Sequence, residues 1–241
     1  MIKSQSFDYR EGATVLEGYV AYDDAIHGKR PGVLVVPEWG GVNASTHRRC
    51  DQLAEMGYIA VAGDVYGKGI RPQGFEAAVK TSKPYYDDRA LLRRRGHACF
   101  EALRAHPLTD PKRIAGIGYC FGGITILEVA RAGGDVAGVV CFHTQLLTSM
   151  PATTPGSIKA KILVLHGADD PVVPQKEIDD FIAEMRVAKA DWQLISYGNA
   201  VHSYTNPEIP LDPSGTKPAA YEPNADRRSW THMQDFFREI F

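Results

Sequence analysis

The segment that decides the fold is Arg113–Gly122, RIAGIGYCFG, in which an apolar run leads into Cys120 with a glycine two residues away on each side. The run predicts a buried strand, and the residues that follow it predict a helix. A chain that turns directly from a strand into a helix leaves room only for glycine at Gly118 and Gly122, and it holds the central residue in a strained conformation. The pattern therefore predicts that the Cys120 side chain is lifted above the carboxyl end of the sheet.

This turn has the G-x-S-x-G form of a nucleophile elbow, with sulfur in place of the serine oxygen. The start of a helix favours negative charge, so it stabilises a thiolate and an oxyanion that forms beside it. Cys120 is therefore the candidate nucleophile. The alternative is a buried cysteine in a glycine-rich turn, but the strand before the motif and the helix after it favour the elbow.

Six short apolar runs predict the strands of a sheet. They are continuously apolar, as parallel strands buried on both faces are, and longer helical patterns separate them. An earlier segment, Thr14–Tyr22, alternates more and predicts an antiparallel edge. We expect a single domain, residues 1–241, of the α/β-hydrolase fold, with a mostly parallel central sheet and helices on both faces. The six runs are Gly32–Pro37, Tyr58–Ala62, Arg113–Tyr119, Val136–Phe142, Lys161–His166 and Trp192–Tyr197.

Three segments repeat apolar residues at the spacing of one helix face, and we expect these faces to lie in the core. Residues 205–225 differ, because they contain five prolines and show no period. A stretch of this kind predicts either a lid or a surface loop that leads to the last helix. The three helical sets are Leu92, Cys99 and Leu103; Ile178, Phe181, Ile182 and Met185; and Trp230, Met233, Phe237 and Ile240.

The acid and the base of a hydrolase triad follow the nucleophile in chain order. The run 161–166 leads into His166-Gly167-Ala168-Asp169-Asp170, where Asp170 is our choice for the acid and Asp169 the second candidate. The run 192–197 leads into a loop that carries His202, placed where an imidazole can reach the nucleophile. The carboxylate would hold that imidazole in the right tautomer. One of the two aspartates also fits a turn or a helix cap.

Composition narrows the classes of partner. Lys and Arg number 27 and Asp and Glu 29, for a net charge of −2, so we expect neither nucleic acid nor a membrane surface as partner. The sequence shows no leader and no membrane span, which predicts a cytoplasmic protein. Its four cysteines form no C-x-x-C pair, so we expect free thiols, with no metal and no cofactor.

Four motifs together resemble the dienelactone hydrolase family, over nearly the whole chain. The resemblance implies that Glu38 holds the resting thiol and helps to form the thiolate. It also implies that the backbone N–H groups of Phe121 and Trp39 form the oxyanion hole. The four motifs are Pro37-Glu38-Trp39-Gly40-Gly41-Val42-Asn43, Gly118-Tyr119-Cys120-Phe121-Gly122-Gly123, His166-Gly167-Ala168-Asp169-Asp170 and His202-Ser203-Tyr204.

The chain departs from this family where its members hold a substrate carboxylate with arginines. Asn206 stands near the position of the arginine that follows the catalytic histidine, and Arg71 is only a candidate for the second one. We therefore expect an apolar or aryl ester or lactone rather than dienelactone itself. Tyr66, Arg71, His143 and Tyr204 are the candidate pocket residues.

The resulting hypothesis is a hydrolase in which Cys120, His202 and Asp170 form a triad and a thioester acyl-enzyme is the intermediate. Its partner would be a small ester or lactone, and its assembly a monomer or a homodimer. One alternative is the hydrolysis of activated phosphotriesters at the same site. Alternatives of another class are a binding protein without catalysis and a redox-sensing thiol protein, which would need a resolving cysteine.

Overall fold

The structure is a computed structural model that describes residues 1–212 and 214–241; Pro213, in the proline-rich stretch, lies outside the described residues. Eight strands are hydrogen-bonded in the order β1-β2-β4-β3-β5-β6-β7-β8, which confirms the predicted α/β architecture with a mostly parallel sheet. The strands are β1 (Ile2–Glu11), β2 (Thr14–Asp23), β3 (Arg30–Val36), β4 (Ile59–Ala62), β5 (Thr109–Tyr119), β6 (Gly138–Phe142), β7 (Lys161–Gly167) and β8 (Trp192–Tyr197). The helices are α1 (Ala44–Glu55), α2 (Phe75–Asp87), α3 (Arg89–Arg104), α4 (Phe121–Arg131), α5 (Gln175–Ala188) and α6 (Pro223–Ile240).

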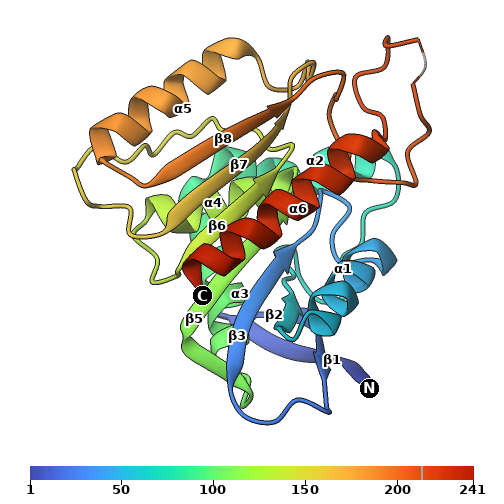
Figure 1. The fold of residues 1–241 in the computed structure, drawn as a ribbon, viewed down its shortest axis with the longest axis vertical. Helices are drawn as coiled ribbons and strands as arrows, with labels where there is room; N and C mark the ends of the chain where they lie inside the picture. Colours follow the sequence, from blue (N-terminus) through green and yellow to red (C-terminus); the bar gives the residue numbers. More distant parts are fainter. Residues whose placement is uncertain (213) are drawn as a thin grey trace. The chain divides into compact units, whose positions relative to one another are not determined.

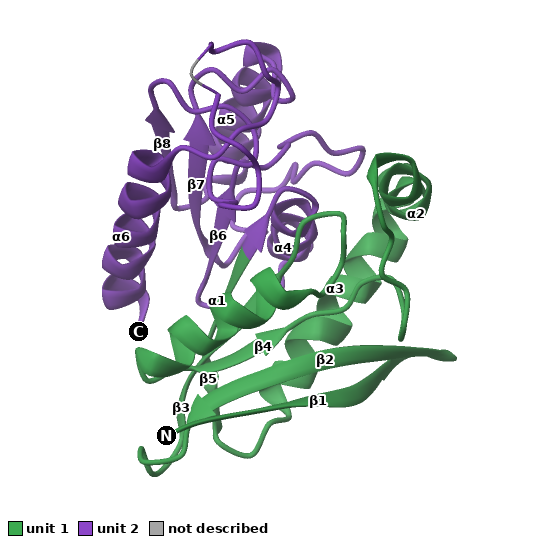
Figure 2. Cartoon of the chain, turned by 90° about the vertical axis from the view of Figure 1, so that its right-hand side faces the viewer, with its two compact units in different colours: residues 1–117 green, residues 118–241 purple. Residues whose placement is uncertain are grey.

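The chain divides into two compact units, Met1–Ile117 and Gly118–Phe241, so that the boundary falls near the end of β5 (Figure 2). In the first unit β1 and β2 form an antiparallel pair, β2 pairs antiparallel with β4, and β3 pairs parallel with β4. Helices α1 and α3 cover opposite faces of these strands (Figure 2). The expectation of a single domain over residues 1–241 stays a prediction.

In the second unit β6, β7 and β8 are parallel, and α4 and α6 lie on opposite faces of β6 (Figure 1). Side-chain alternation along β6 explains this arrangement. The Cys141 Sγ lies 3.6 Å from the carbonyl oxygen of Gly123 in α4. A β-carbon at Gly138, three residues earlier and therefore on the other face, would lie 2.8 Å from the Phe236 ring of α6. Gly138 thus lets α6 pack directly on the strand.

All six apolar runs form strands, but the predicted position of the antiparallel edge strand is wrong. Segment Thr14–Tyr22 does form an antiparallel strand, β2, yet it is not an edge, because β1 pairs along its outer side. The true edge, β1, is mostly polar and exposed, so hydrophobicity does not reveal it. At the other end of the sheet, β8 is half-exposed, because an edge strand has a neighbour on one side only. Within the described residues, no helix has both the length and the apolar character needed to cross a membrane.

We predict that Gly138→Ala destabilises the protein by about 1–3 kcal/mol, because the added methyl group forces the Phe236 ring away from β6. Urea denaturation measures this change in the free energy of unfolding. Gly198→Ala is the matched control, since nothing lies within 4 Å of its β-carbon position and its φ angle is not positive. Equal stabilities of the two variants would contradict the close packing of α6 on Gly138.

Candidate active site

The turn at Cys120 has the strained geometry that the sequence predicts. Cys120 has φ 50° and ψ −113°, and it directly precedes α4. A β-carbon at Gly118 would overlap the backbone of Gly122, and a β-carbon at Gly123 would overlap the Thr144 side chain. The turn therefore needs glycine at Gly118 and Gly123. Its result is that Cys120 is half-buried, with its sulfur on the side where the loops after β6, β7 and β8 emerge.

Cys120, His202 and Asp170 form one connected row. The Cys120 Sγ lies 3.1 Å from His202 Nε2, and His202 Nδ1 lies 2.8 Å from Asp170 Oδ2. All three residues belong to the second unit, and each follows the carboxyl end of a different strand: β5, β7 and β8. A nucleophile, a base and an orienting carboxylate at these separations have the geometry of a nucleophilic triad.

The two adjacent aspartates have different environments. Asp170 has a fully buried side chain, and its other carboxylate oxygen accepts a 2.8 Å hydrogen bond from the backbone N–H of Val172. Asp169 is exposed, and its backbone N–H donates to the Ala200 carbonyl. Only Asp170 contacts the imidazole of His202. The geometry thus favours the first of the two candidates, and Asp169 serves the turn.

The electrostatics of His202 favour its charged form. Burial by itself lowers the pKa of this imidazole, but the sulfur of Cys120 and the hydrogen bonds to Asp170 and Cys120 together raise the pKa well above its usual value. The direction of this shift favours the imidazolium form of His202 when a thiolate stands beside it. His166, which is buried nearby, behaves in the opposite way, because burial lowers its pKa. Of the two imidazoles, the one that faces the sulfur therefore has the pKa that favours the charged form.

The backbone of His202 is held by the far end of the proline-rich stretch. The His202 N–H donates to the carbonyl of Pro218, and the N–H of Ala220 donates to the carbonyl of His202, at 3.3 and 3.1 Å. The N–H of Glu222 then donates to the Tyr204 carbonyl at 3.1 Å. Residues 218–222 therefore fix the loop that carries the base, before α6 begins at Pro223. The role of 205–225 as a lid stays a prediction.

Comparison with known proteins identifies the protein family. The sequence pattern of the dienelactone hydrolase family matches residues 16–241. The chain belongs to the dienelactone hydrolase family. A crystal structure of a dienelactone hydrolase-like promiscuous phosphotriesterase from metagenomic libraries superposes with a TM-score of 0.93 at 41% identity, covering 100% of this chain and 99% of that one. A Yersinia pestis protein provisionally assigned as a carboxymethylenebutenolidase is 26% identical, with 93% of this chain and 84% of that protein covered. These relatives confirm the predicted family and the α/β-hydrolase fold.

In this dienelactone hydrolase-family chain, the other three cysteines differ from Cys120. Cys50, Cys99 and Cys141 are buried. Burial raises the pKa of Cys99 and Cys141 to about 12 and raises that of Cys50 well above its ordinary value. These thiols stay protonated and shielded, which makes them poor nucleophiles. Cys120 alone among the four combines partial exposure with an imidazole partner.

The first unit of this family member holds the remaining predicted site residues. The Glu38 carbonyl accepts from the Gly41 N–H at 3.0 Å, and the Tyr66 hydroxyl donates to the Trp39 carbonyl at 2.9 Å. Arg71 forms an ion pair with Glu17 at 3.4 Å and lies 3.8 Å from the buried carboxylate of Asp64. The tight turn at Glu38 is thus fixed by backbone and tyrosine contacts, and two carboxylates offset the charge of Arg71.

Two predicted pocket residues are buried next to His202 in the second unit. His143 and Tyr204 are both fully buried, and each ring packs edge-on against its neighbour: His143 lies 5.3 Å from His202 and 5.3 Å from Tyr204. The Tyr204 hydroxyl donates to the Leu165 carbonyl at 3.1 Å. In this structure both side chains therefore support the His202 loop from within the protein.

Two threonines of this region were not found from the sequence. The Thr144 hydroxyl lies within hydrogen-bond distance of the carbonyls of Cys120 and Phe142, at 3.3 and 3.0 Å. The Thr205 hydroxyl lies 2.8 Å from His143 Nε2. Neither residue belongs to a motif with a fixed spacing, because each contact depends on how two loops meet. The requirement for glycine at Gly123 was the available signal for a close neighbour such as Thr144.

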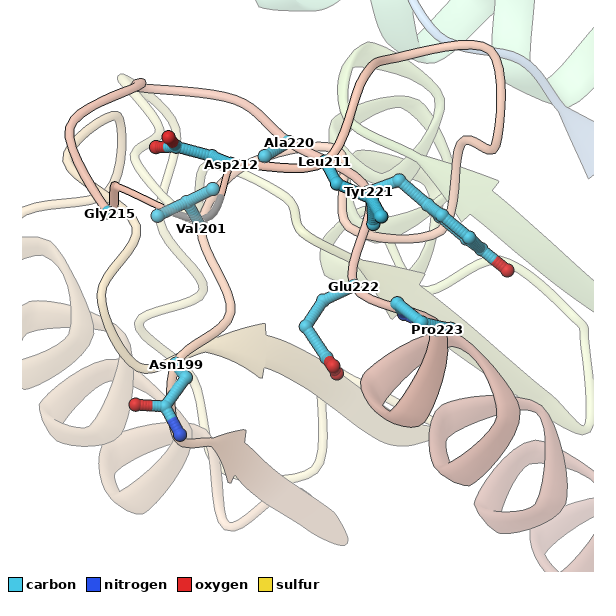
Figure 3. Close-up of a pocket in the computed structure, with 9 residues that line it drawn as sticks. All are labelled: Asn199, Val201, Leu211, Asp212, Gly215, Ala220, Tyr221, Glu222 and Pro223. Carbon is cyan, nitrogen blue, oxygen red and sulfur yellow. The ribbon is translucent and has the colours of Figure 1, made fainter.

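A separate cavity of about 330 Å³ lies beside the His202 loop, between the end of β8 and the start of α6 (Figure 3). Asn199 marks the β8 side, and Glu222 and Pro223 mark the α6 side (Figure 3). Val201 and Ala220, which also line it, flank the backbone bonds that hold His202. None of the triad residues lines this cavity, so it is not the place where a reacting carbonyl meets the sulfur.

We predict that the His202 imidazole titrates above the ordinary histidine pKa in the wild-type protein. Its raised value depends on the sulfur, so Cys120→Ala should lower the His202 pKa, and Asp170→Asn should lower it as well. Histidine-selective NMR titration measures these values. His106, whose pKa burial lowers, serves as an internal control that should not change. A His202 pKa at or below the ordinary value in the wild type would contradict the charged pair.

Proposed function

We propose that this protein hydrolyses carboxylic esters or lactones, with Cys120 as nucleophile, His202 as acid and base, and Asp170 as the group that orients His202. The contact that carries the proposal is the 3.1 Å separation between Cys120 Sγ and His202 Nε2. Membership of the dienelactone hydrolase family supports hydrolysis as the reaction class. The half-buried sulfur beside a helix N-terminus supports attack by a thiolate.

In the first half-reaction the thiolate attacks the carbonyl carbon, a C–S bond forms and the carbonyl oxygen becomes an oxyanion. The N–H of Phe121, the first residue of α4, is the proposed donor to this oxyanion, worth about 3 kcal/mol of transition-state stabilisation. Protonated His202 gives its proton to the leaving alkoxide as the C–O bond breaks. The product of this step is a thioester on Cys120.

In the second half-reaction His202, now neutral, removes a proton from water, and the water oxygen attacks the thioester carbon. The C–S bond then breaks, the carboxylic acid leaves, and the thiolate and the imidazolium re-form. Asp170 keeps Nδ1 of His202 protonated throughout, so that Nε2 is the atom that exchanges the proton. The roles that the family resemblance implies for Glu38 and Trp39 stay predictions.

We further propose an uncharged, apolar or aryl substrate. Arg71 is paired with Glu17 and lies close to Asp64 within its own unit, so its charge is already balanced. Asn206 stands where the family resemblance implies an arginine. A substrate carboxylate would therefore lack the two cationic partners that the family resemblance implies. Cytoplasmic placement and assembly as a monomer or homodimer stay predictions from the sequence.

Activated phosphotriesters are the second candidate substrates. The relative that is 41% identical over the full chain is described as a promiscuous phosphotriesterase. A thiolate, an imidazolium and an N–H donor suit the oxyanion of an attacked phosphoryl group as well as that of a carbonyl. The two reactions share Cys120, so the substrate panel rather than the active-site geometry distinguishes them.

The decisive experiment is to mix the protein briefly with aryl esters, aryl lactones and aryl phosphotriesters and to measure both turnover and mass. We expect ester or lactone turnover, an acyl mass on the peptide that contains Cys120, and loss of both in Cys120→Ala. Cys141→Ala is the control, because its thiol is buried and should stay unmodified. Ester and lactone turnover at the wild-type rate in Cys120→Ala would refute the proposed nucleophile. Turnover of phosphotriesters alone would favour the second candidate.

The two aspartates provide a matched pair of variants. Asp170→Asn should lower kcat by about 10⁴-fold, because the amide favours the wrong tautomer of His202 while keeping the shape of the side chain. Asp169→Asn should leave kcat within about twofold, because an exposed side chain without contact to His202 has a small effect. Steady-state kinetics on the best ester compares the two. A larger loss in Asp169→Asn would transfer the role to that residue.

A further inference from the structure

Three residues at the end of β6, Phe142, His143 and Thr144, contact both the nucleophile and the base. The N–H of Cys120 donates to the Phe142 carbonyl at 3.0 Å. The Thr144 hydroxyl lies within hydrogen-bond distance of both carbonyls, 3.3 Å from that of Cys120 and 3.0 Å from that of Phe142. The ring of His143, between these two residues, packs edge-on against His202. This β6 corner, residues 142–144, is therefore the structural link between the backbone of Cys120 and the ring of His202.

His143 has a positive φ angle, which residues other than glycine adopt uncommonly. Its φ angle is 39°, in the left-handed region, and its side chain is fully buried. A left-handed backbone angle at a bulky residue is strained and persists only when surrounding contacts hold it. Here the His143 N–H donates to the Leu165 carbonyl at 2.9 Å, and Nε2 lies 2.8 Å from the Thr205 hydroxyl.

Thr205 lies three residues after His202, and it is also buried. The bond from His143 to Thr205 thus fixes the second end of the short turn that begins at His202. Ser203, inside this turn, has a φ angle of 56°, so the turn is strained as well. The first end is already fixed by the backbone bonds from His202 to Pro218 and Ala220. With both ends held, the imidazole has little freedom to move away from the sulfur.

From this geometry we infer that His143 and Thr205 are positioning residues that hold His202 at bonding distance from Cys120. The contacts that carry the inference join His143 to the His202 ring and to the Thr205 hydroxyl. They act by fixing the His202 loop against the strand end that also fixes the Cys120 backbone. The inference rests on the proposed function, because it assigns a role in that same triad. A plain packing role would leave the pairing of sulfur and imidazole unchanged when only the hydrogen bond is removed.

The test compares Thr205→Val with Thr205→Ser. Valine keeps the shape and removes the hydroxyl, so we expect kcat to fall about tenfold, consistent with the loss of one buried hydrogen bond. KM should change by less than about twofold, because the interaction removed is not made with substrate. Serine restores the hydroxyl and should restore most of kcat. Thermal unfolding of both variants checks that each is folded under the assay conditions.

A second readout follows the pairing of sulfur and imidazole without any substrate. The rate of Cys120 alkylation by iodoacetamide, measured against pH, reports how well the imidazolium stabilises the thiolate. Thr205→Val should move the midpoint of this profile to higher pH, and Thr205→Ser should return it. His143→Leu removes the same hydrogen bond and also the ring contact with His202, so it should shift the midpoint at least as far as Thr205→Val. The double variant should shift it little further than His143→Leu alone, because the hydrogen bond is lost in both.

The outcomes separate this inference from the proposed function. An unchanged alkylation profile in Thr205→Val, or equal loss in Thr205→Val and Thr205→Ser, would overturn the positioning role. Additive losses in the double variant would overturn it too, because they would show two independent effects. Absence of all ester, lactone and phosphotriester turnover in the wild type would refute the proposed hydrolase. In that case the alkylation profiles still decide whether His143 and Thr205 hold His202 beside Cys120.

Discussion

The contact between a sulfur and an imidazole nitrogen at 3.1 Å is the interaction on which the rest of the site depends. It requires Cys120 to stand at the end of a turn that most residues cannot adopt. Backbone carbonyls and a threonine side chain occupy the space around this turn, so Gly118 and Gly123 have no substitute. It also requires that a histidine on another loop lie within hydrogen-bond distance of the sulfur. The fold meets both needs because β6, β7 and β8 are parallel, so the loops after them emerge together. The Cys120 N–H, directly after β5, donates to the Phe142 carbonyl at the end of β6.

The buried titrating groups of the second unit differ in the direction of their pKa shifts, and burial alone does not explain the difference. Burial raises the pKa of the Cys141 thiol to about 12, although the charge of Arg131 acts in the opposite direction. His166 loses affinity for a proton through burial, while His202, almost as buried, gains affinity because it touches Cys120 and Asp170. Depth alone thus does not determine the charge. The partner at hydrogen-bond distance decides which imidazole carries the proton.

The sequence was most informative where local physics alone determines the structure. Each continuous apolar run formed a strand, and Gly118 stands where a β-carbon would overlap the backbone, as predicted. The second crowded position is Gly123, and the predicted need for glycine at Gly122 stays a prediction. The polar strand β1 was missed, because its pairing with β2 satisfies backbone hydrogen bonds without burying its side chains. The sequence proposed His143 as a pocket residue. Its contact with Thr205 depends on how two loops fold together, and such a contact has no spacing of its own.

The choice between Asp169 and Asp170 shows the same limit. The two residues are adjacent and chemically identical, so the spacing of the motif favoured Asp170 but did not exclude Asp169. The Val172 N–H and the burial of one carboxylate distinguish them, and both depend on the direction of a single turn. By contrast, the order of nucleophile, acid and base along the chain follows from the order of the strands. The sequence can therefore predict the three loops, but it cannot predict every atom within them.

The pairing of His202 with Pro218 and Ala220 gives the proline-rich stretch an evolutionary meaning. Both ends of this stretch are hydrogen-bonded at the His202 loop, so the residues between them form a loop that starts and ends beside the base. The length or composition of that loop can change while the position of His202 stays the same. A descendant of this protein could thus acquire a new specificity by replacing this loop, while Cys120, His202 and Asp170 keep their positions.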